Sequence, residues 1–178
     1  MRVLDLFSGL GGWSAAFKDR GHSVTTLDIE PKFKPDIVKD ILEIKSIAEI
    51  GEFDIILASP PCTEFSKASM PSSWNRNRSV NPDTTIMRKT YELISAHQPR
   101  LWAIENVRGS VKFFTPIMGN YRQKAGSRYL WGNFPILNTE PVYGKWKLPP
   151  SPDRAALRAL IPYSLSLAMC EAAERDLA

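Results

Sequence analysis

The chain has 178 residues and a mass of 20.0 kDa, with 43% hydrophobic and 24% charged residues. This composition is typical of a globular protein and excludes a disordered, fibrous or tandem-repeat chain. Cys62 and Cys170 lie too far apart for a disulfide framework or a zinc motif, which favours a reducing cytoplasm. No apolar stretch approaches the roughly 20 residues of a membrane span, and the first residues are not typical of a signal peptide. We therefore expect a cytoplasmic protein without a metal site.

The net charge of +4 is unevenly distributed along the chain. Residues 1–66 carry seven Lys/Arg and eleven Asp/Glu, whereas residues 67–147 carry thirteen Lys/Arg and four Asp/Glu. A basic middle of this kind indicates either a polyanionic partner held by one face or a solvated basic surface.

Short apolar runs, each followed by a turn or a helical pattern, predict the strands. β-branched residues are frequent in these runs, and glycine or proline follows the first and the third. A hairpin that turns at Gly132-Asn133 is expected after them. The predicted strands are Arg2–Phe7, Ser23–Ile29, Phe53–Ala58 and Leu101–Val107, and the predicted hairpin is Tyr129–Leu137.

Helical patterns alternate with these strands. The first, Trp13–Arg20, is stopped by a glycine. The second begins near Asn81-Pro82-Asp83, where a capping side chain and a proline are typical of a helix start. The last begins at Tyr163, where apolar residues recur at helical spacing. This alternation predicts an α/β domain with a mostly parallel sheet and helices on both faces, which binds ligands outside the carboxyl ends of its strands.

A glycine-rich turn follows the first predicted strand. Glycines in the segment Ser8–Gly12 let a ligand approach the backbone, and the helix that follows offers unpaired N–H groups. Asp28 closes the second strand, where a carboxylate can bind both hydroxyls of a ribose. Asp40, in the segment Val38-Lys39-Asp40-Ile41, is a candidate contact for an adenine amino group at the end of a strand. Each carboxylate alone is typical of a surface or capping residue, but together with the turn they describe a site for an adenosine-containing cofactor.

Two further strand ends carry reactive side chains. Cys62 follows the strand Phe53–Ala58 on a loop stiffened by two prolines, as expected of a nucleophile or of a small buried residue. Glu105 lies in the apolar strand Leu101–Val107. Burying a carboxylate there is costly unless it is paired or protonated, so a raised pKa is expected, which suits a general acid.

Three motifs follow one another in the order Asp5-Leu6-Phe7-Ser8-Gly9-x-Gly11-Gly12, Pro61-Cys62-x-x-Phe65-Ser66 and Glu105-Asn106-Val107. In this order and spacing they resemble the motifs of the cytosine-5 DNA methyltransferases. The resemblance covers the N-terminal two thirds of the chain. It implies a Rossmann-like, S-adenosylmethionine-dependent methyltransferase fold.

The resemblance also implies a role for each site residue. Cys62 would attack carbon 6 of cytosine, and Glu105 would protonate or hydrogen-bond ring nitrogen 3. A methyl group would then pass from S-adenosylmethionine to carbon 5 of a cytosine taken out of the DNA helix. The residues implied to bind the cofactor are Phe7, Ser8, Gly9, Gly11 and Pro60, with Asp28 on the ribose and Asp40 on the adenine.

The later part of the chain departs from the family pattern. The glutamine-and-arginine motif is absent as such, and Arg128 is its nearest counterpart. The closing Gly-Asn-Ser/Ala-Val signature is also missing, with Ile161–Leu165 in roughly its place. Between Pro135 and Ile161 there is room for a loop but not for a target-recognition region, so residues 1–178 are expected to form a single catalytic domain.

The basic middle is the expected source of contacts with DNA. Phosphate contacts by its side chains would give affinity with a steep salt dependence and little sequence specificity. Three other readings stay open: the same chemistry on RNA, on a free nucleotide, or a non-catalytic subunit of a split or degenerate methyltransferase. The residues predicted to contact nucleic acid are Ser66, Lys67, Arg76, Arg78 and Arg128.

Overall fold

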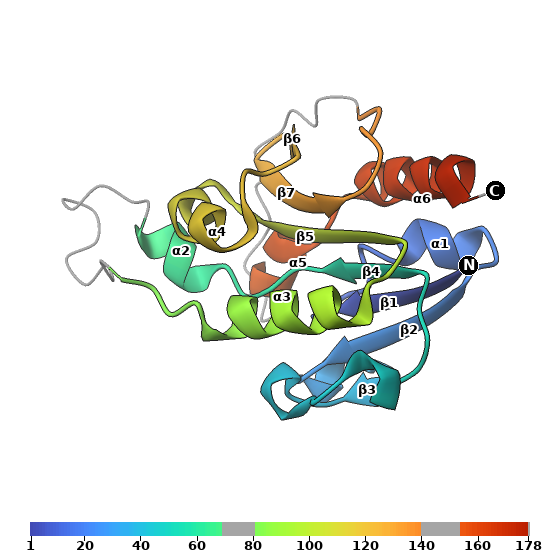
Figure 1. Cartoon of the computed structure of the whole chain (residues 1–178), viewed down its shortest axis with the longest axis horizontal. Helices are drawn as coiled ribbons and strands as arrows, with labels where there is room; N and C mark the ends of the chain where they lie inside the picture. Colours follow the sequence, from blue (N-terminus) through green and yellow to red (C-terminus); the bar gives the residue numbers. More distant parts are fainter. Residues whose placement is uncertain (69–80, 140–153, 178) are drawn as a thin grey trace.

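A central β-sheet organises the chain (Figure 1). The computed structural model describes residues 1–68, 81–139 and 154–177. Within these residues seven strands form one sheet. The strands are β1 (Arg2–Leu6), β2 (Ser23–Asp28), β3 (Ile37–Val38), β4 (Ile55–Ala58), β5 (Leu101–Val107), β6 (Gln123–Ala125) and β7 (Arg128–Asn133).

Helices connect the strands and cover both faces of the sheet. The α-helices are α1 (Ala15–Asp19), α2 (Thr63–Ala68), α3 (Thr85–His97), α4 (Val111–Met118), α5 (Arg154–Ala159) and α6 (Tyr163–Leu177). Short 3-10 helices are η1 (Pro31–Phe33), η2 (Ile41–Glu43), η3 (Ile47–Glu49) and η4 (Arg108–Ser110). None of the helices in the described part of the chain is long and apolar enough to cross a bilayer.

The strand order is β3-β2-β1-β4-β5-β7-β6. The first five of these strands pair in parallel, whereas β7 is antiparallel to β5 and β6 is antiparallel to β7. The chain leaves β1 toward β2 and later returns to the other side of β1 as β4. Such a change of direction opens a crevice at the carboxyl ends of the two central strands, which is where open α/β sheets bind ligands.

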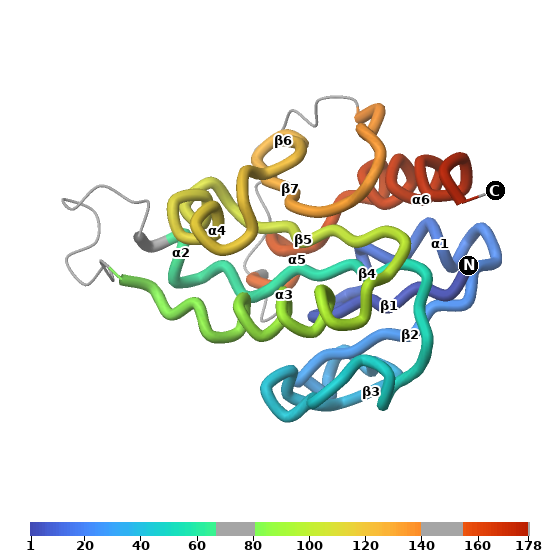
Figure 2. The backbone as a smooth tube through the Cα atoms, viewed as in Figure 1, coloured from blue at the N-terminus to red at the C-terminus, as the bar shows by residue number. Residues whose placement is uncertain are grey.

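Successive side chains of the strands point alternately into two apolar cores, one on each face of the sheet. Val3 of β1 points to the face that α1 and α6 cover, where it packs with Phe17 and Met169. Its neighbour Leu4 points to the opposite face, which α3 and α4 cover. Figure 2 shows α1 and α6 side by side, in agreement with their direct packing. The predicted α/β fold with helices on both faces is therefore confirmed.

Most of the predicted elements are present with small shifts. The strand Leu101–Val107 and the start of the last helix at Tyr163 agree with the predicted bounds. The first helix begins at Ala15 instead of Trp13, because the glycine turn continues to that point. The second helix begins at Thr85, where the Asp83 carboxylate accepts the Thr85 N–H at 2.8 Å.

The predicted hairpin around Gly132-Asn133 is wrong. The observed hairpin joins β6 to β7 and turns at Gly126-Ser127, with Gly126 in the left-handed region at φ 61°. Gly132 lies inside β7, where a Cβ atom would come within 2.1 Å of the Trp102 carbonyl oxygen. This glycine therefore permits close approach of β5 and is not part of a turn.

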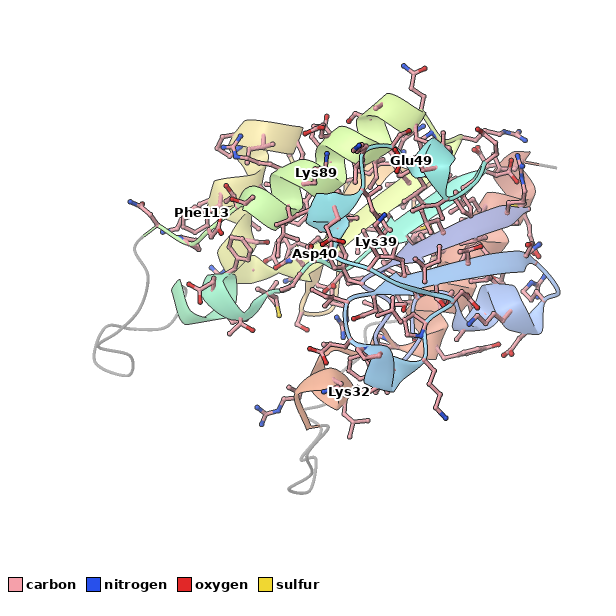
Figure 3. The ribbon with its side chains drawn as sticks, turned by 90° about the horizontal axis from the view of Figure 1, so that it is seen from below. Lys32, Lys39, Asp40, Glu49, Lys89 and Phe113 are labelled. Atoms are coloured by element: carbon pink, nitrogen blue, oxygen red, sulfur yellow. The ribbon has the colours of Figure 1, made fainter. Side chains whose placement is uncertain are left out.

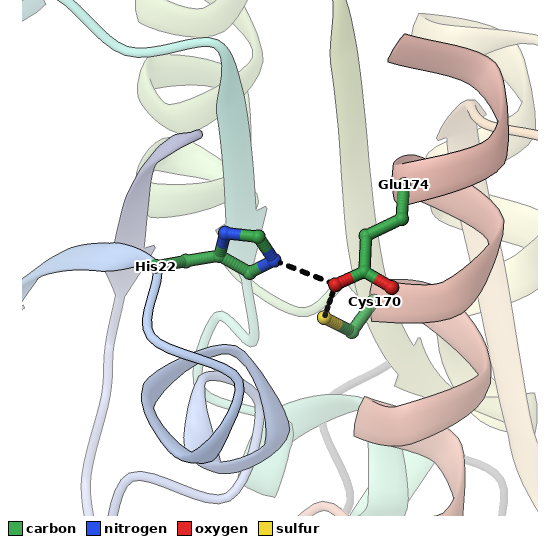
Figure 4. A group of neighbouring side chains, drawn as sticks. All are labelled: His22, Cys170 and Glu174. Carbon is green, nitrogen blue, oxygen red and sulfur yellow. Dashed lines mark hydrogen bonds and ion pairs between the residues drawn. The ribbon is translucent and has the colours of Figure 1, made fainter. Parts of the chain in front are cut away.

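An ion-pair cluster fastens α6 to the turn after α1 (Figure 4). Two nitrogens of the Arg20 guanidinium donate to the two carboxylate oxygens of Glu174, at 2.9 and 2.7 Å. His22 Nε2 lies 3.0 Å from the same carboxylate, and the Cys170 thiol lies 3.9 Å from it. Because the guanidinium already engages both oxygens, we interpret the cluster as a structural clamp between distant parts of the chain.

The Glu174 clamp predicts a pH-dependent stability. Its hydrogen bond from Arg20, helped by His22, lowers the pKa of Glu174 to about 2 from an ordinary 4.5. A lowered pKa stabilises the fold above the unfolded value, and this contribution is lost as the pH falls from 4.5 toward 2. Glu174→Gln should lower the free energy of unfolding by about 1 kcal/mol at pH 7.

Urea unfolding between pH 7 and pH 3 measures this effect. The difference between the wild type and Glu174→Gln should shrink as the pH falls. Glu171→Gln, on the exposed surface of the same helix, is the matched control and should follow the wild type. A gap between wild type and Glu174→Gln that stays constant over this pH range would contradict the clamp.

Candidate active site

Three loops meet at the carboxyl edge of β1, β4 and β5. In the sheet register Leu6 lies beside Ala58, and Ala58 lies beside Ile104. The Ser59 N–H extends the pairing by donating to the Leu6 carbonyl at 3.3 Å. The glycine turn, the loop with Cys62 and the end of β5 with Glu105 therefore follow neighbouring strands at one edge.

The glycine turn has an unusual backbone conformation. Phe7, Gly9 and Gly11 all have positive φ angles, of 61°, 48° and 76°. The turn is held by the Ser8 N–H, which donates to the Leu27 carbonyl at 3.1 Å. A Cβ atom at Gly11 would meet nothing within 4 Å, so the backbone borders open space. A left-handed Phe7 costs free energy, and such strain is typical of functional sites.

Asp28 joins the end of β2 to this turn. Its carboxylate accepts the Gly9 N–H at 2.8 Å through one oxygen and the Glu30 N–H at 2.9 Å through the other. The residue is buried, with 7% of its surface exposed. Each carboxylate oxygen keeps a further lone pair, so Asp28 can still accept hydrogen bonds from a ligand.

Asp40 lies two residues after β3 (Figure 3). Its carboxylate accepts the Leu42 N–H at 2.9 Å and so caps η2. Capping is one of the two roles that the sequence left open, and a contact with adenine stays a prediction.

The segment before α6 packs onto the glycine turn. A Cβ atom at Gly12 would lie 2.6 Å from the Ile161 carbonyl oxygen, so this approach requires glycine. The buried Ser166 hydroxyl donates to the Trp13 carbonyl at 2.6 Å and accepts the Ala16 N–H at 3.1 Å. The part of the chain where the closing family signature was missing therefore packs against the glycine turn.

Sequence reasoning assigned no role to Asp5. Asp5 lies on β1, and its carboxylate is buried. It accepts a hydrogen bond from the Ser14 hydroxyl at 2.6 Å, which fixes the far end of the glycine turn. Burial raises the pKa of Asp5 to about 7, against a smaller opposing effect of the Ser14 hydrogen bond. The signal in the sequence was a carboxylate inside an apolar strand, the same signal that identified Glu105.

The loop with Cys62 is tied to β5. Asn106 donates its side-chain N–H to the Pro60 carbonyl at 3.0 Å, and its side-chain oxygen accepts the Val107 N–H at 2.9 Å. Cys62 itself is half-buried directly before α2, and its carbonyl accepts the Ser66 N–H at 2.8 Å. The predicted nucleophile is thus held between a fixed proline loop and the first turn of a helix.

Glu105 is buried and paired. Arg128 of β7 donates from Nη1 to a Glu105 carboxylate oxygen at 2.9 Å and from Nη2 to the Leu160 carbonyl at 2.6 Å. Burial raises the pKa of Glu105, and the charge and hydrogen bond of Arg128 oppose this rise. Two of the Arg128 nitrogens are therefore engaged within the protein. A contact of Arg128 with nucleic acid stays a prediction.

The other predicted contacts with nucleic acid are described only in part. Ser66 is half-buried in α2. The backbone of Lys67 belongs to the same helix, but its side chain is outside the described structure. Arg76 and Arg78 lie outside the described residues.

Residues 1–115 match the sequence profile of the C-5 cytosine-specific DNA methylases. The chain belongs to this family. S-adenosylmethionine is the methyl donor of the family, so the predicted family and the predicted cofactor are confirmed at this level.

The curated relatives are longer than this chain. A protein named as a DNA (cytosine-5)-methyltransferase of Frog virus 3 is 33% identical over 117 residues, which cover 60% of this chain and 53% of that protein. A type II methyltransferase of a Bacillus species is 25% identical over 121 residues, covering 62% of this chain and 37% of the relative. The chain thus spans about half, or less, of the length of these relatives.

Solved structures support the same fold. A protein described as a DNA modification methyltransferase encoded within an Escherichia coli prophage has a TM-score of 0.50 and 22% identity, covering 74% of this chain and 46% of that one. The Entamoeba histolytica methyltransferase EhMeth has a TM-score of 0.50 and 19% identity, covering 79% and 55%. The predicted Rossmann-like methyltransferase fold is confirmed.

The buried Asp5 predicts a fall in stability with rising pH. Because its pKa is about 7 in the fold and 3.8 when unperturbed, the native state binds more protons than the unfolded state between these values. The free energy of unfolding should therefore decrease from pH 4 to pH 7. Asp5→Asn keeps an acceptor for Ser14 but cannot ionise, so it should remove this part of the decrease.

Urea unfolding of wild type and Asp5→Asn over this pH range provides the measurement. Asp176→Asn removes an exposed carboxylate on α6 and should keep the wild-type profile. Superimposable profiles for wild type and Asp5→Asn would contradict a raised pKa for Asp5.

Proposed function

We propose that this chain transfers a methyl group from S-adenosylmethionine to carbon 5 of cytosine in DNA. The observation that carries the proposal is the position of Cys62 and Glu105, which follow or end adjacent parallel strands beside the glycine turn. Membership of the C-5 cytosine-specific DNA methylase family supports it. We also propose that residues 1–178 form one catalytic domain and act in the cytoplasm, where a reactive thiol stays reduced.

The residues at the glycine turn fit the cofactor. Backbone with positive φ and open space at Gly11 allows a ligand to approach closely, and the Asp28 carboxylate ends the neighbouring strand. When bound, S-adenosylmethionine supplies an electrophilic methyl group. In this proposal Phe7, Ser8, Gly9, Gly11 and Pro60 surround it, Asp28 binds the ribose and Asp40 binds the adenine.

Cys62 and Glu105 divide the activation of cytosine between them. Carbon 5 of cytosine is a weak nucleophile until a thiolate adds to carbon 6 and shifts an electron pair into the ring. Glu105 stabilises this shift by giving a proton or a hydrogen bond to ring nitrogen 3. Its raised pKa supports the role, because the carboxyl then keeps its proton to a higher pH. After carbon 5 carries the methyl group, water takes the proton from carbon 5, the double bond between carbons 5 and 6 re-forms, and the bond from carbon 6 to sulfur breaks to release the Cys62 thiolate. The proton on ring nitrogen 3 returns to Glu105.

Two side chains position these groups. Arg128 holds the Glu105 carboxylate in one orientation, and its second bond to the Leu160 carbonyl fixes the guanidinium. Asn106 holds the Pro60 carbonyl and thereby the loop with Cys62. Removing either one would leave buried polar atoms without partners, so the site depends on both.

Formation of 5-methylcytosine tests the proposal. The purified protein is incubated with radiolabelled S-adenosylmethionine and unmethylated DNA, and the DNA is digested to nucleosides. Label should appear in 5-methylcytosine. Cys62→Ala should abolish it, and Glu105→Gln should reduce the rate by roughly 10²–10⁴-fold. Label in RNA under the same conditions, with none in DNA, would overturn the choice of substrate.

A covalent trap separates the nucleophile from a structural role of Cys62. An oligonucleotide with 5-fluorocytosine has no proton to lose from carbon 5, so the methylated adduct with the sulfur cannot be resolved. Wild type should form a species on a denaturing gel with the combined mass of protein and DNA. The variants Cys62→Ser and Cys170→Ser should differ from each other in this assay. The first should form no adduct and the second should form it normally, because Cys170 is a buried residue of α6 in the apolar core.

Cofactor affinity tests Asp28. Asp28→Asn removes the charge but keeps the shape, and it should weaken binding of S-adenosylmethionine by about tenfold or more, since bonds to a charged group are strong. Glu49→Ala, at an exposed carboxylate on η3 (Figure 3), is the control and should bind normally. Titration calorimetry measures both, and unchanged affinity for Asp28→Asn would remove this residue from the cofactor site.

A further inference from the structure

The Ser59 hydroxyl is a polar group of the candidate site that the roles above do not use. Ser59 directly follows β4, and its N–H donates to the Leu6 carbonyl, so its backbone is fixed as a continuation of that strand. Its side-chain oxygen is buried and has no hydrogen-bond partner in the described part of the chain. A buried hydroxyl without a partner is unfavourable and rare in native proteins. A partner that forms only during the reaction would account for it.

The sheet register places Ser59 beside Glu105 (Figure 1). Ala58 of β4 pairs with Ile104 of β5, so the next residues along the two strands, Ser59 and Glu105, are also neighbours. Ala58 and Ile104 both point into the core that α3 and α4 cover. Because successive side chains alternate between the faces, Ser59 and Glu105 both point to the opposite face.

The Ser59 hydroxyl already acts on the carboxyl group of Glu105. Burial raises the pKa of Glu105, and Arg128 and then Ser59 oppose this rise. Arg128 of β7 is the charged group that affects the pKa of Glu105 in the described part of the chain, and it binds one carboxylate oxygen. The neighbours Ala103 and Leu130 on the same face are apolar. Ser59 is therefore the polar side chain available to the second oxygen.

The proposed reaction changes the charge on Glu105. As the Cys62 thiolate adds to carbon 6 of cytosine, the Glu105 proton moves to ring nitrogen 3, and negative charge develops on the carboxyl group. One oxygen keeps its bond from Arg128, and the other accepts the new N–H of the ring. That second oxygen has a further lone pair, which a hydroxyl can occupy. A donor fixed beside it stabilises the charge as it forms.

We propose that Ser59 is a positioning residue for Glu105: its hydroxyl donates to the oxygen that Arg128 leaves free when Glu105 passes its proton to the cytosine. Ser59 keeps its own proton throughout. This inference rests on the proposed function, because the charge that Ser59 stabilises arises in that reaction. Glu105 is then held from both neighbouring strands, by Arg128 on β7 and by Ser59 at the end of β4.

Methylation kinetics with labelled S-adenosylmethionine test this role. Ser59→Ala should lower kcat by about tenfold or more, because hydrogen bonds to charged groups are strong. KM for S-adenosylmethionine should stay near the wild-type value, since the bond forms only as the charge develops. Ser59→Thr keeps a hydroxyl and should retain most of the activity. The matched control Ser23→Ala removes an exposed hydroxyl at the first residue of β2 and should behave as the wild type does.

The pH dependence separates positioning from packing. Glu105 acts in its protonated form, so the rate should fall as the pH rises through its pKa. Ser59→Ala removes an effect that lowers this pKa, so its descending limb should lie at higher pH than that of the wild type. A side chain that only fills space would change the rate without moving the limb.

Carbon-13 NMR measures the same quantity without turnover. The protein is labelled at the glutamate carboxyl carbons, and the Glu105 signal is identified by its absence from Glu105→Gln. This signal should titrate at higher pH in Ser59→Ala than in the wild type or in Ser23→Ala. Circular dichroism establishes that each variant is folded.

Three results would overturn the role of Ser59: a wild-type kcat in Ser59→Ala, equal loss of activity in Ser59→Ala and Ser59→Thr, or an unchanged titration of Glu105 in Ser59→Ala. Any of these in a protein whose wild type forms 5-methylcytosine would reject this role alone. A titration of Glu105 at higher pH in Ser59→Ala, with no 5-methylcytosine from the wild type, would reject the proposed reaction and keep the contact between Ser59 and Glu105.

Discussion

The parallel pairing of β1 with β4, and of β4 with β5, is the constraint on which the candidate site depends. The register sets Leu6 beside Ala58 and Ala58 beside Ile104, so the three strands end together. Residues about 50 positions apart in sequence become neighbours in this way, and hydrogen bonds from Ser59 to Leu6 and from Asn106 to Pro60 join them. The antiparallel β7 then adds Arg128 to the same edge, because its register brings it opposite Val107, two residues beyond Glu105.

Two carboxylates of the candidate site are buried, which is unfavourable for a charged group. Asp5 and Glu105 both interrupt apolar strands, and burial raises the pKa of each. Each has a partner of a different kind: a neutral hydroxyl from Ser14 for Asp5, and a guanidinium from Arg128 for Glu105. A neutral partner leaves Asp5 free to stay protonated near neutral pH, whereas a cation favours the ionised form of Glu105. The two carboxylates thus share a raised pKa but differ in the partner that opposes the rise.

The sequence predicted what depends on local pattern. The strand with Glu105, the turn at Gly9 and Gly11, and the helix from Tyr163 all follow from periodicity and from the residues that begin or end an element. Contacts between distant segments could not be read in this way. Nothing in the local sequence indicates that Arg128 reaches Glu105 or that Gly132 faces the Trp102 carbonyl. The hairpin prediction failed for this reason, since a glycine is equally typical of a turn and of a close approach.

The contact between Ile161 and Gly12 affects the order in which the protein can fold during its synthesis on the ribosome. The three motifs that identify the family lie in the first 107 residues, but the contact of Gly12 with Ile161 and the hydrogen bond from Arg128 to Leu160 need the segment before α6. Translation delivers these residues some fifty positions after the last motif. The nascent chain can therefore pair its parallel strands early while the wall of the glycine turn stays open. The glycine turn reaches its final packing only when the segment before α6 has emerged.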